Sequence, residues 1–172
     1  MPSFQDSVDL GYRYLETDVH LSADGVLFAF HDHNLRALTG VNADIADLDA
    51  GEIDALLVDG IAPIPRLDDV FLTWPNARLN IDEKSDATVM PLIASIRAHK
   101  AIDRVCVGSF VDRRTKNCRQ ELGPELCTSM GKFEAARLSL ASRGLGDTRQ
   151  VSAGCAQLPL RMRFKVTTPA LV

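Results

Sequence analysis

Short apolar segments alternate along this chain with longer stretches that have the periodicity of helices. Six segments have the character of β-strands: residues 14–19, 26–30, 79–84, 105–110, 126–130 and 155–158. Helical spacing or helix-start signals occupy residues 3–10, 65–70, 89–100, 112–122 and 132–143, with a further start at 167–169. Strands that alternate with helices of about 10–12 residues are typical of βαβ units and a parallel sheet. We therefore expect an α/β fold.

Two stretches refine this picture. Residues 33–63 are rich in Asp, Ala and Gly and show no clear period, so we expect an irregular insertion there within a single domain that spans 1–172. In the helix expected at 132–143, the apolar residues recur at helical spacing. These residues are Phe133, Ala136, Leu140 and Ala141.

The first strand carries two acids where apolar residues are expected. Glu16 and Asp18 are two residues apart, so they point to the same face of the strand. A parallel strand is normally apolar on both faces, and adjacent carboxylates repel each other and resist desolvation. A divalent cation would relieve both problems, because hard cations bind carboxylate oxygens. The alternative is an exposed or edge strand with solvated acids, and the Glu-x-Asp pattern alone leaves it open.

The third strand has one fully polar face, formed by Asn80, Asp82 and Lys84. Asp82 is a candidate third carboxylate for a cation, and Lys84 could bind an anion as a point charge. The alternative is a surface strand with an Asp–Lys pair. Glu83 points to the opposite face, so its charge either packs against helices or lies at the exposed end of the strand.

A histidine follows the second apolar strand. His31 comes directly after Phe30, and the carboxyl ends of parallel strands are where α/β folds place their chemistry. A histidine there could act as a general acid or base near neutral pH. A loop histidine without a role is the alternative, and His20 is a weaker catalytic candidate. Acids, a lysine and a histidine near strand ends are typical of a metal-assisted hydrolase or lyase that acts on an anionic substrate.

Composition excludes several other classes of function. The chain has 172 residues and a net charge of −4, and it contains no basic run, so it should bind neither nucleic acid nor anionic membranes. No stretch approaches the ~20 apolar residues of a membrane span. The first residues lack the basic and apolar regions of a secretory signal, so we expect a cytoplasmic protein. The oligomeric state is left open.

The four cysteines show no CxxC and no zinc-ligand spacing. Cys106 and Cys127 lie in apolar segments, where cysteine usually acts as a small buried side chain. Because four is an even number, the cysteine count leaves open whether disulfide bonds form.

Taken with their neighbours, these residues resemble the glycerophosphodiester phosphodiesterase family. The similarity covers essentially the whole chain through Tyr-Leu-Glu-Thr-Asp-Val at 14–19, Asp-Gly-Val at 24–26, Phe-His-Asp at 30–32, Ile-Pro-Arg-Leu-Asp-Asp-Val at 64–70, Leu-Asn-Ile-Asp-Glu-Lys at 79–84 and Val-Gly-Ser-Phe at 107–110. The resemblance implies a (β/α)₈ TIM barrel of the phospholipase C-like phosphodiesterase kind. It also implies hydrolysis of small glycerophosphodiesters to glycerol 3-phosphate and an alcohol, in lipid and glycerol metabolism.

The resemblance assigns a role to each candidate residue. Glu16, Asp18 and Asp82 would be the ligands of one divalent cation, Mg²⁺ or Ca²⁺. His31 would be one of two catalytic histidines, and Lys84 would contact the phosphate.

The family pattern also includes parts that have no counterpart here. Its first strand ends in His-Arg-Gly, and its last strands carry a tryptophan and Gly-x-Asp-Gly. We therefore expect a partial barrel with about six of the eight strands, one catalytic histidine, and a chain that is inactive by itself. Two alternatives stay open: a metal-dependent phospholipase of the sphingomyelinase D kind, and an inactive barrel that serves only as a binding module.

Overall fold

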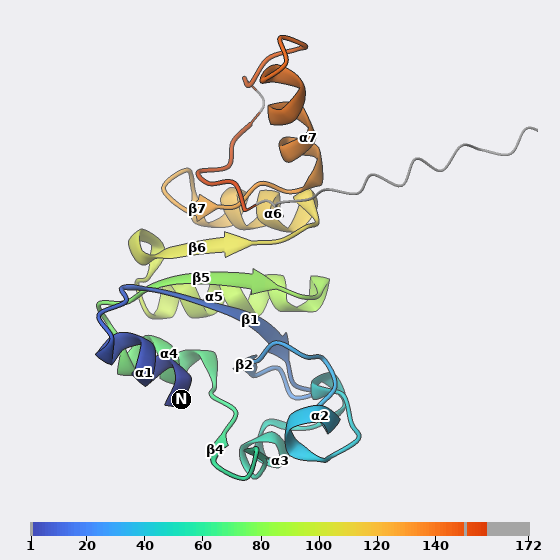
Figure 1. Cartoon of the computed structure of the whole chain (residues 1–172). Coiled ribbons are helices and arrows are strands. Elements are labelled where there is room, and N and C mark those ends of the chain that lie inside the picture. The colour runs from blue at the N-terminus through green and yellow to red at the C-terminus, as the bar shows by residue number, and fades with distance from the viewer. Residues whose placement is uncertain (1, 150, 158–172) are drawn as a thin grey trace, which may run out of the picture.

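The computed structural model describes residues 2–149 and 151–157, and its central feature is a five-stranded sheet in the order β2-β1-β5-β6-β7 (Figure 1). The strands are β1 (Tyr14–Leu21), β2 (Leu27–Ala29), β5 (Arg78–Glu83), β6 (Val105–Gly108) and β7 (Cys127–Thr128). Strands β1, β5, β6 and β7 are parallel neighbours, which confirms the expected α/β fold.

The strand expected at 155–158 is reduced to a single parallel bridge between Ser129 and Cys155. Leu158 and the helix start expected at 167–169 lie outside the described residues.

Strand β2 departs from the parallel arrangement and runs antiparallel to β1, with Val19 opposite Ala29 and Leu21 opposite Leu27. The two strands are joined by a tight turn in which Gly25 has a φ of 89°. Parallel strands need a crossover connection of a dozen or more residues, so this short turn can only return the chain antiparallel.

Helices cover one face of the sheet (Figure 1). They are α1 (Pro2–Asp9), α4 (Leu67–Thr73), α5 (Val89–Ala98) and α6 (Asp112–Leu122), with short 3₁₀ turns η2 (Asp86–Thr88) and η3 (Ile102–Arg104). The core between helices and sheet includes Leu79, Ile81 and Val107 from the strands and Leu92 and Ile96 from α5. Among the described residues, no helix is long and apolar enough to cross a membrane.

The segment expected to be irregular, 33–63, contains short regular elements. They are α2 (Arg36–Thr39), η1 (Ile45–Asp47), α3 (Ala50–Asp54), β3 (Leu57–Val58) and β4 (Ala62–Pro63). Its buried residues form a second apolar cluster with the end of the β1–β2 hairpin: Phe28, Phe30, Leu35, Ile45, Ala50, Ile53 and Ile64. These residues are too widely spaced in sequence to show a period, which is why the pattern did not predict the elements.

The last described helix, α7 (Lys132–Ala141), exposes two of the apolar residues that recur at helical spacing. Phe133 is 75% exposed and Leu140 is 47% exposed, whereas Glu134 and Ala135 are buried. Glu134 faces inward because its carboxylate pairs with Arg119 at 3.5 Å and accepts the Ser152 backbone N–H at 2.9 Å. These polar contacts, rather than the weak apolar periodicity of the helix, decide which side of α7 faces inward.

The strand register places side chains in rows across the sheet, on the face away from the helices. One row is Glu16, Asn80, Cys106 and Cys127, and the next is Asp18, Asp82 and Gly108. The polar residues predicted from alternation therefore meet on one face.

Candidate active site

Two aspartates from neighbouring strands form the centre of the candidate site. Asp18 of β1 and Asp82 of β5 are direct register partners, and both precede the carboxyl ends of their strands. The Asp18 side chain is only 6% exposed, and that of Asp82 is 18% exposed. Two carboxylates this close and this buried need positive charge nearby.

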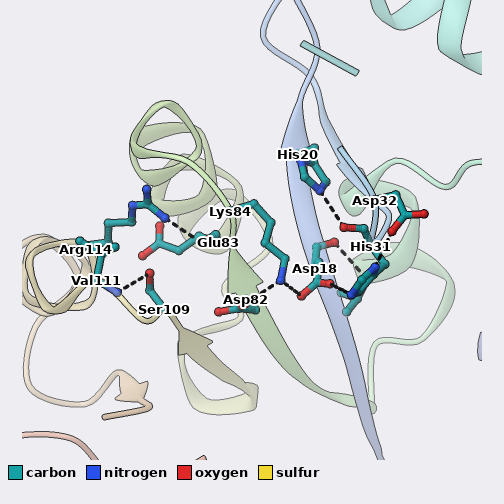
Figure 2. Close-up of polar contacts among 11 residues, drawn as sticks. Asp18, His20, His31, Asp32, Asp82, Glu83, Lys84, Ser109, Val111 and Arg114 are labelled. Carbon is teal, nitrogen blue, oxygen red and sulfur yellow. Dashed lines mark hydrogen bonds and ion pairs between the residues drawn. The ribbon is translucent and has the colours of Figure 1, made fainter. Parts of the chain in front are cut away.

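Lys84 supplies that charge (Figure 2). It follows the last residue of β5, and its Nζ lies 2.9 Å from Asp18 Oδ1 and 2.9 Å from Asp82 Oδ2. Burial lowers the pKa of Lys84, but the hydrogen bonds to Asp18 and Asp82 outweigh it, so the net shift is upward. The ammonium therefore remains charged across the physiological range.

His31 lies on the other side of Asp18. Its ring Nε2 is 3.7 Å from Asp18 Oδ2, and its Nδ1 is 2.7 Å from Asp32 Oδ1. The His31 backbone is anchored, because its carbonyl accepts a hydrogen bond from His20 Nε2 at 3.1 Å. The ring itself is 83% exposed. The hydrogen bond to Asp32, followed by the charge of Asp18, raises the pKa of His31.

Glu16 stands one row below the two aspartates and is exposed at the wall of the same cavity. Burial, followed by the charges of Asp18 and Asp82, raises the pKa of Glu16. The site thus carries more negative charge than Lys84 alone compensates.

All five residues predicted from the sequence line one open cavity of about 330 Å³. Sequence reasoning missed its other lining residues, which are Ser109, Phe110, Ser129, Met130 and Gln157. Ser109 follows β6 directly, so its place at a strand end was a usable signal. The sequence held no such signal for Gln157, because the position of Gln157 depends on the path of the segment after α7.

Gly108 leaves room for this arrangement. A Cβ at this position would lie 3.2 Å from Asp82 Oδ1, 3.3 Å from Gln157 Oε1 and 3.4 Å from Ser129 Oγ. The absence of a side chain at Gly108 allows the walls of the cavity to approach one another.

The donor chemistry of Glu16, Asp18 and Asp82 fits a hard divalent cation such as Mg²⁺ or Ca²⁺, because all three offer carboxylate oxygens. Burial is the largest cause of the raised pKa of Glu16, and an added cation would relieve the smaller contribution from the charges of Asp18 and Asp82. The three carboxylates are more widely spread than a compact ligand set. In the described part of the chain, one group of three His, Cys, Asp or Glu side chains has its ligand atoms all within 4.8 Å of one another, and that group consists of cysteines rather than of these carboxylates.

The sequence profile of the glycerophosphoryl diester phosphodiesterase family matches residues 1–147. The chain belongs to this family. A Mycobacterium tuberculosis protein named "Probable glycerophosphodiester phosphodiesterase 2" is 33% identical over 178 residues, which cover 100% of this chain and 67% of that protein. Human lysophospholipase D GDPD1 is 36% identical over 103 residues, which cover 52% of this chain and 33% of the human protein.

Solved structures of phosphodiesterases agree with the fold. The chain matches a glycerophosphodiester phosphodiesterase from Agrobacterium tumefaciens with a TM-score of 0.67 and 25% identity, over 75% of this chain and 58% of that one. It matches an Oleispira antarctica phosphodiesterase, solved in complex with the product sn-glycerol-3-phosphate, with a TM-score of 0.68 and 20% identity, over 92% of this chain and 77% of that one. The described residues thus form part of the TIM barrel of the family, as the resemblance implied.

Proposed function

We propose that this site binds glycerophosphodiesters and, together with one divalent cation, serves their hydrolysis to glycerol 3-phosphate and an alcohol. One observation carries the proposal: Lys84 lies between Asp18 and Asp82 and faces an open cavity that His31 also lines. Family membership supports the reaction class, and the oxygen donors support the cation.

Glu16, Asp18 and Asp82 are the residues that would hold Mg²⁺ or Ca²⁺. When bound, such a cation supplies charge stabilisation for a phosphoryl oxygen. Lys84 adds a fixed positive charge from the protein itself. Because its hydrogen bonds to two carboxylates keep it protonated, it can contact a phosphate as a point charge at any physiological pH.

His31 would be the group that accepts or donates a proton during hydrolysis. Its Nδ1 is engaged by Asp32, so Nε2 is the ring nitrogen that lies toward Asp18 and the cavity. In the neutral ring, Asp32 favours the tautomer with the proton on Nδ1, which leaves Nε2 free to accept a proton. In the protonated ring, Nε2 donates instead, so this geometry serves either the base or the acid step.

The proposal is tested by calorimetric titration of the purified chain with sn-glycerol 3-phosphate, with and without Mg²⁺ or Ca²⁺. We expect binding that depends on the cation. Lys84→Met should weaken binding by about 10–100-fold, because it removes a charge-assisted contact of about 1.5–3 kcal/mol. Lys116→Met, an exposed lysine of α6, is the matched control and should have no effect. Equal affinities in the two variants, or no binding by the wild type, would contradict the proposal.

Turnover is a separate question. Acid–base hydrolysis of a phosphodiester takes one proton from the nucleophile and gives one to the leaving alkoxide. His31 is the one histidine that lines this cavity among the described residues. We therefore expect the 172-residue chain to hydrolyse glycerophosphocholine slowly or not at all. Robust hydrolysis would show that the residues described here suffice.

A second substrate class is favoured by a neighbouring cavity of about 440 Å³ that shares Glu16, Asp18 and His31 with the first. Its other walls are largely apolar and include Phe4, Phe30, Leu38, Ile61 and Pro65. An acyl chain could occupy it while the phosphate lies at Lys84, which would suit a lysophospholipid and accords with the name of the human relative. In that case, lysophosphatidic acid should bind more tightly than glycerol 3-phosphate, and Phe30→Ser should remove the difference.

A further inference from the structure

Three cysteines from separate parts of the chain meet beside the sheet. Cys106 comes from β6, Cys127 from β7, and Cys155 from the segment that follows α7. Their sulfur atoms all lie within 4.8 Å of one another, and Cys106 Sγ is 3.3 Å from Cys155 Sγ. Each side chain is partly exposed, unlike Cys118, which is buried in the helix-side core. The three-cysteine cluster therefore differs from cysteines that only fill space.

Backbone contacts fix this convergence. Cys106 and Cys127 are register partners in adjacent parallel strands. Cys155 is held by its bridge to Ser129 and by the Met130 backbone N–H, which donates to the Cys155 carbonyl at 3.0 Å. A Cβ on Gly154 would lie 3.1 Å from Cys127 Sγ, so the glycine leaves space for this thiol. Two strands and one returning segment thus position the three sulfurs.

We propose that Cys106, Cys127 and Cys155 together bind one Zn²⁺ through their sulfur atoms. Thiolate sulfurs are ligands that zinc prefers, whereas Mg²⁺ and Ca²⁺ prefer oxygen, so this site is chemically distinct from the carboxylate site. Of the three carboxylates, Glu16 lies in the same row as Cys106 and Cys127, and Asp18 and Asp82 lie in the next row. Zinc bonded to sulfur at about 2.3 Å in tetrahedral geometry requires sulfurs that lie within a few ångströms of one another, as these do.

Asn80 lies in the same row and is a candidate for the fourth ligand. Asn80 is the register partner of Cys106, and its Oδ1 is buried without a hydrogen-bond partner among the described residues. A water molecule could serve instead, because the cysteines are partly exposed.

The alternative use of the cluster is a disulfide between Cys106 and Cys155. That bond would leave Cys127 without a role, and it would release two protons and two electrons to an oxidant that nothing in the molecule supplies. Zinc binding engages all three sulfurs and requires only the loss of their protons. Because zinc displaces the thiol protons, we expect zinc affinity to increase with pH.

Zinc at this position would also affect the carboxylate cavity. Gln157 lines that cavity and lies two residues after Cys155. A metal that ties Cys155 to β6 and β7 would therefore hold Gln157 in place. The zinc site itself does not depend on the proposed hydrolysis.

The test uses the reduced, metal-free chain titrated with Zn²⁺ against a chromophoric chelator, with native mass spectrometry to count bound metal. We expect one zinc per chain. Cys155→Ser should lower the affinity by more than the roughly 10–100-fold that loss of an outer-shell partner costs. Cys118→Ser, which removes a cysteine outside the cluster, should keep full affinity. Co²⁺ in place of Zn²⁺ should give the sulfur-to-cobalt charge-transfer absorption that reports thiolate ligands.

Several results would overturn the proposal: no zinc bound by the wild type, equal affinity in the Cys155→Ser and Cys118→Ser variants, or a Cys106–Cys155 disulfide that persists under mild reductant. Cys155 is in a segment outside the helices and paired strands, so the Cys155→Ser variant should fold even if the Cys106→Ser variant does not. Circular dichroism checks this. Asp18→Asn should bind zinc as the wild type does, which separates this site from the carboxylate site.

Discussion

Strand β5 carries adjacent carboxylates on its two faces, and the structure treats them differently. Asp82 faces the cavity, where it accepts a hydrogen bond from Lys84 at 2.9 Å (Figure 2). Glu83 faces the helices and is 2% exposed, and among the described residues its Oε2 has no hydrogen-bond partner. Burial raises the pKa of Glu83 to about 7, although the nearby Arg114 opposes the shift.

The difference shows that environment decides the role of each acid. On the cavity face, Asp18 and Asp82 are paired with Lys84 and line an open cavity, so they can exchange the lysine contact for a ligand. On the helix face, the residues are apolar, and Glu83 is tolerated there because it can keep its proton. We therefore expect the helix face to contribute stability and the cavity face to contribute binding.

The largest effect on stability should come from the helix face. Ile81 lies between Asn80 and Asp82 in the sequence, but its side chain points to the helix face and is fully buried. Ile81→Ala should lower the free energy of unfolding by about 2–5 kcal/mol. Urea titration measures this change. Met90→Ala, at an exposed apolar residue of α5, is the control and should cost far less. A loss at Ile81 no greater than that at Met90 would contradict the division.

Glu83→Gln should increase stability at neutral and higher pH. The native state holds the Glu83 proton up to about pH 7, whereas the unfolded chain releases it near its ordinary pKa of 4.5. Stability from protonated Glu83 is complete below pH 4.5 and is lost as pH rises through 7. The neutral glutamine avoids this loss, which amounts to at most about 3 kcal/mol.

Urea titrations from pH 4 to 8 measure this gain, with Glu125→Gln on the exposed surface as the control. The gain at Glu83 should vanish at the acid end of the range. A gain of equal size at every pH would show that titration is not its source.

Gly108→Ala should have a smaller effect, because the added methyl contacts Asp82, Gln157 and Ser129. These side chains must shift by a few tenths of an ångström. We expect a loss of stability near the lower end of the ~1–3 kcal/mol of overpacked sites, and a few-fold weaker glycerol 3-phosphate binding. Gly51→Ala, in open space within α3, serves as the control. Unchanged ligand binding would place Gly108 outside the site.

The smallest effect is a titration shift at His31. Asp32→Asn removes the hydrogen bond that raises the pKa of His31, so this pKa should fall toward 6.5. Because the His31 ring is 83% exposed, stability should not change measurably. An NMR pH titration measures the shift, and His33→Gln assigns the signal. A pKa that stays in place would remove Asp32 from the proposed proton exchange.

Much of the candidate site could be predicted because strand alternation is a local property. It places Glu16 with Asp18, and Asn80 with Asp82, whatever the rest of the chain does. The parallel register then brings Asp18 and Asp82 side by side. Alternation also assigned Glu83 to the opposite face, and of the two environments that the sequence left open for it, the structure shows the buried one.

Non-local features could not be predicted in this way. Cys155 reaches Cys106 and Cys127 only because the chain returns beside β7, and no sequence spacing encodes that path. The inward face of α7 is set by the contact of Glu134 with Arg119, which a helical period does not reveal. The elements within residues 33–63 depend on apolar residues that meet only in the fold.

Calorimetric titration with Ca²⁺ and Mg²⁺ measures whether the three carboxylates on the cavity face bind a divalent cation. The comparison is between the wild type, Glu16→Ala with Asp18→Ala, and a control of equal charge change, Asp47→Ala with Glu125→Ala, at exposed acids. We predict one cation per chain for the wild type and the control, and no detectable binding for the site variant. Binding that is unchanged in the site variant would contradict the account.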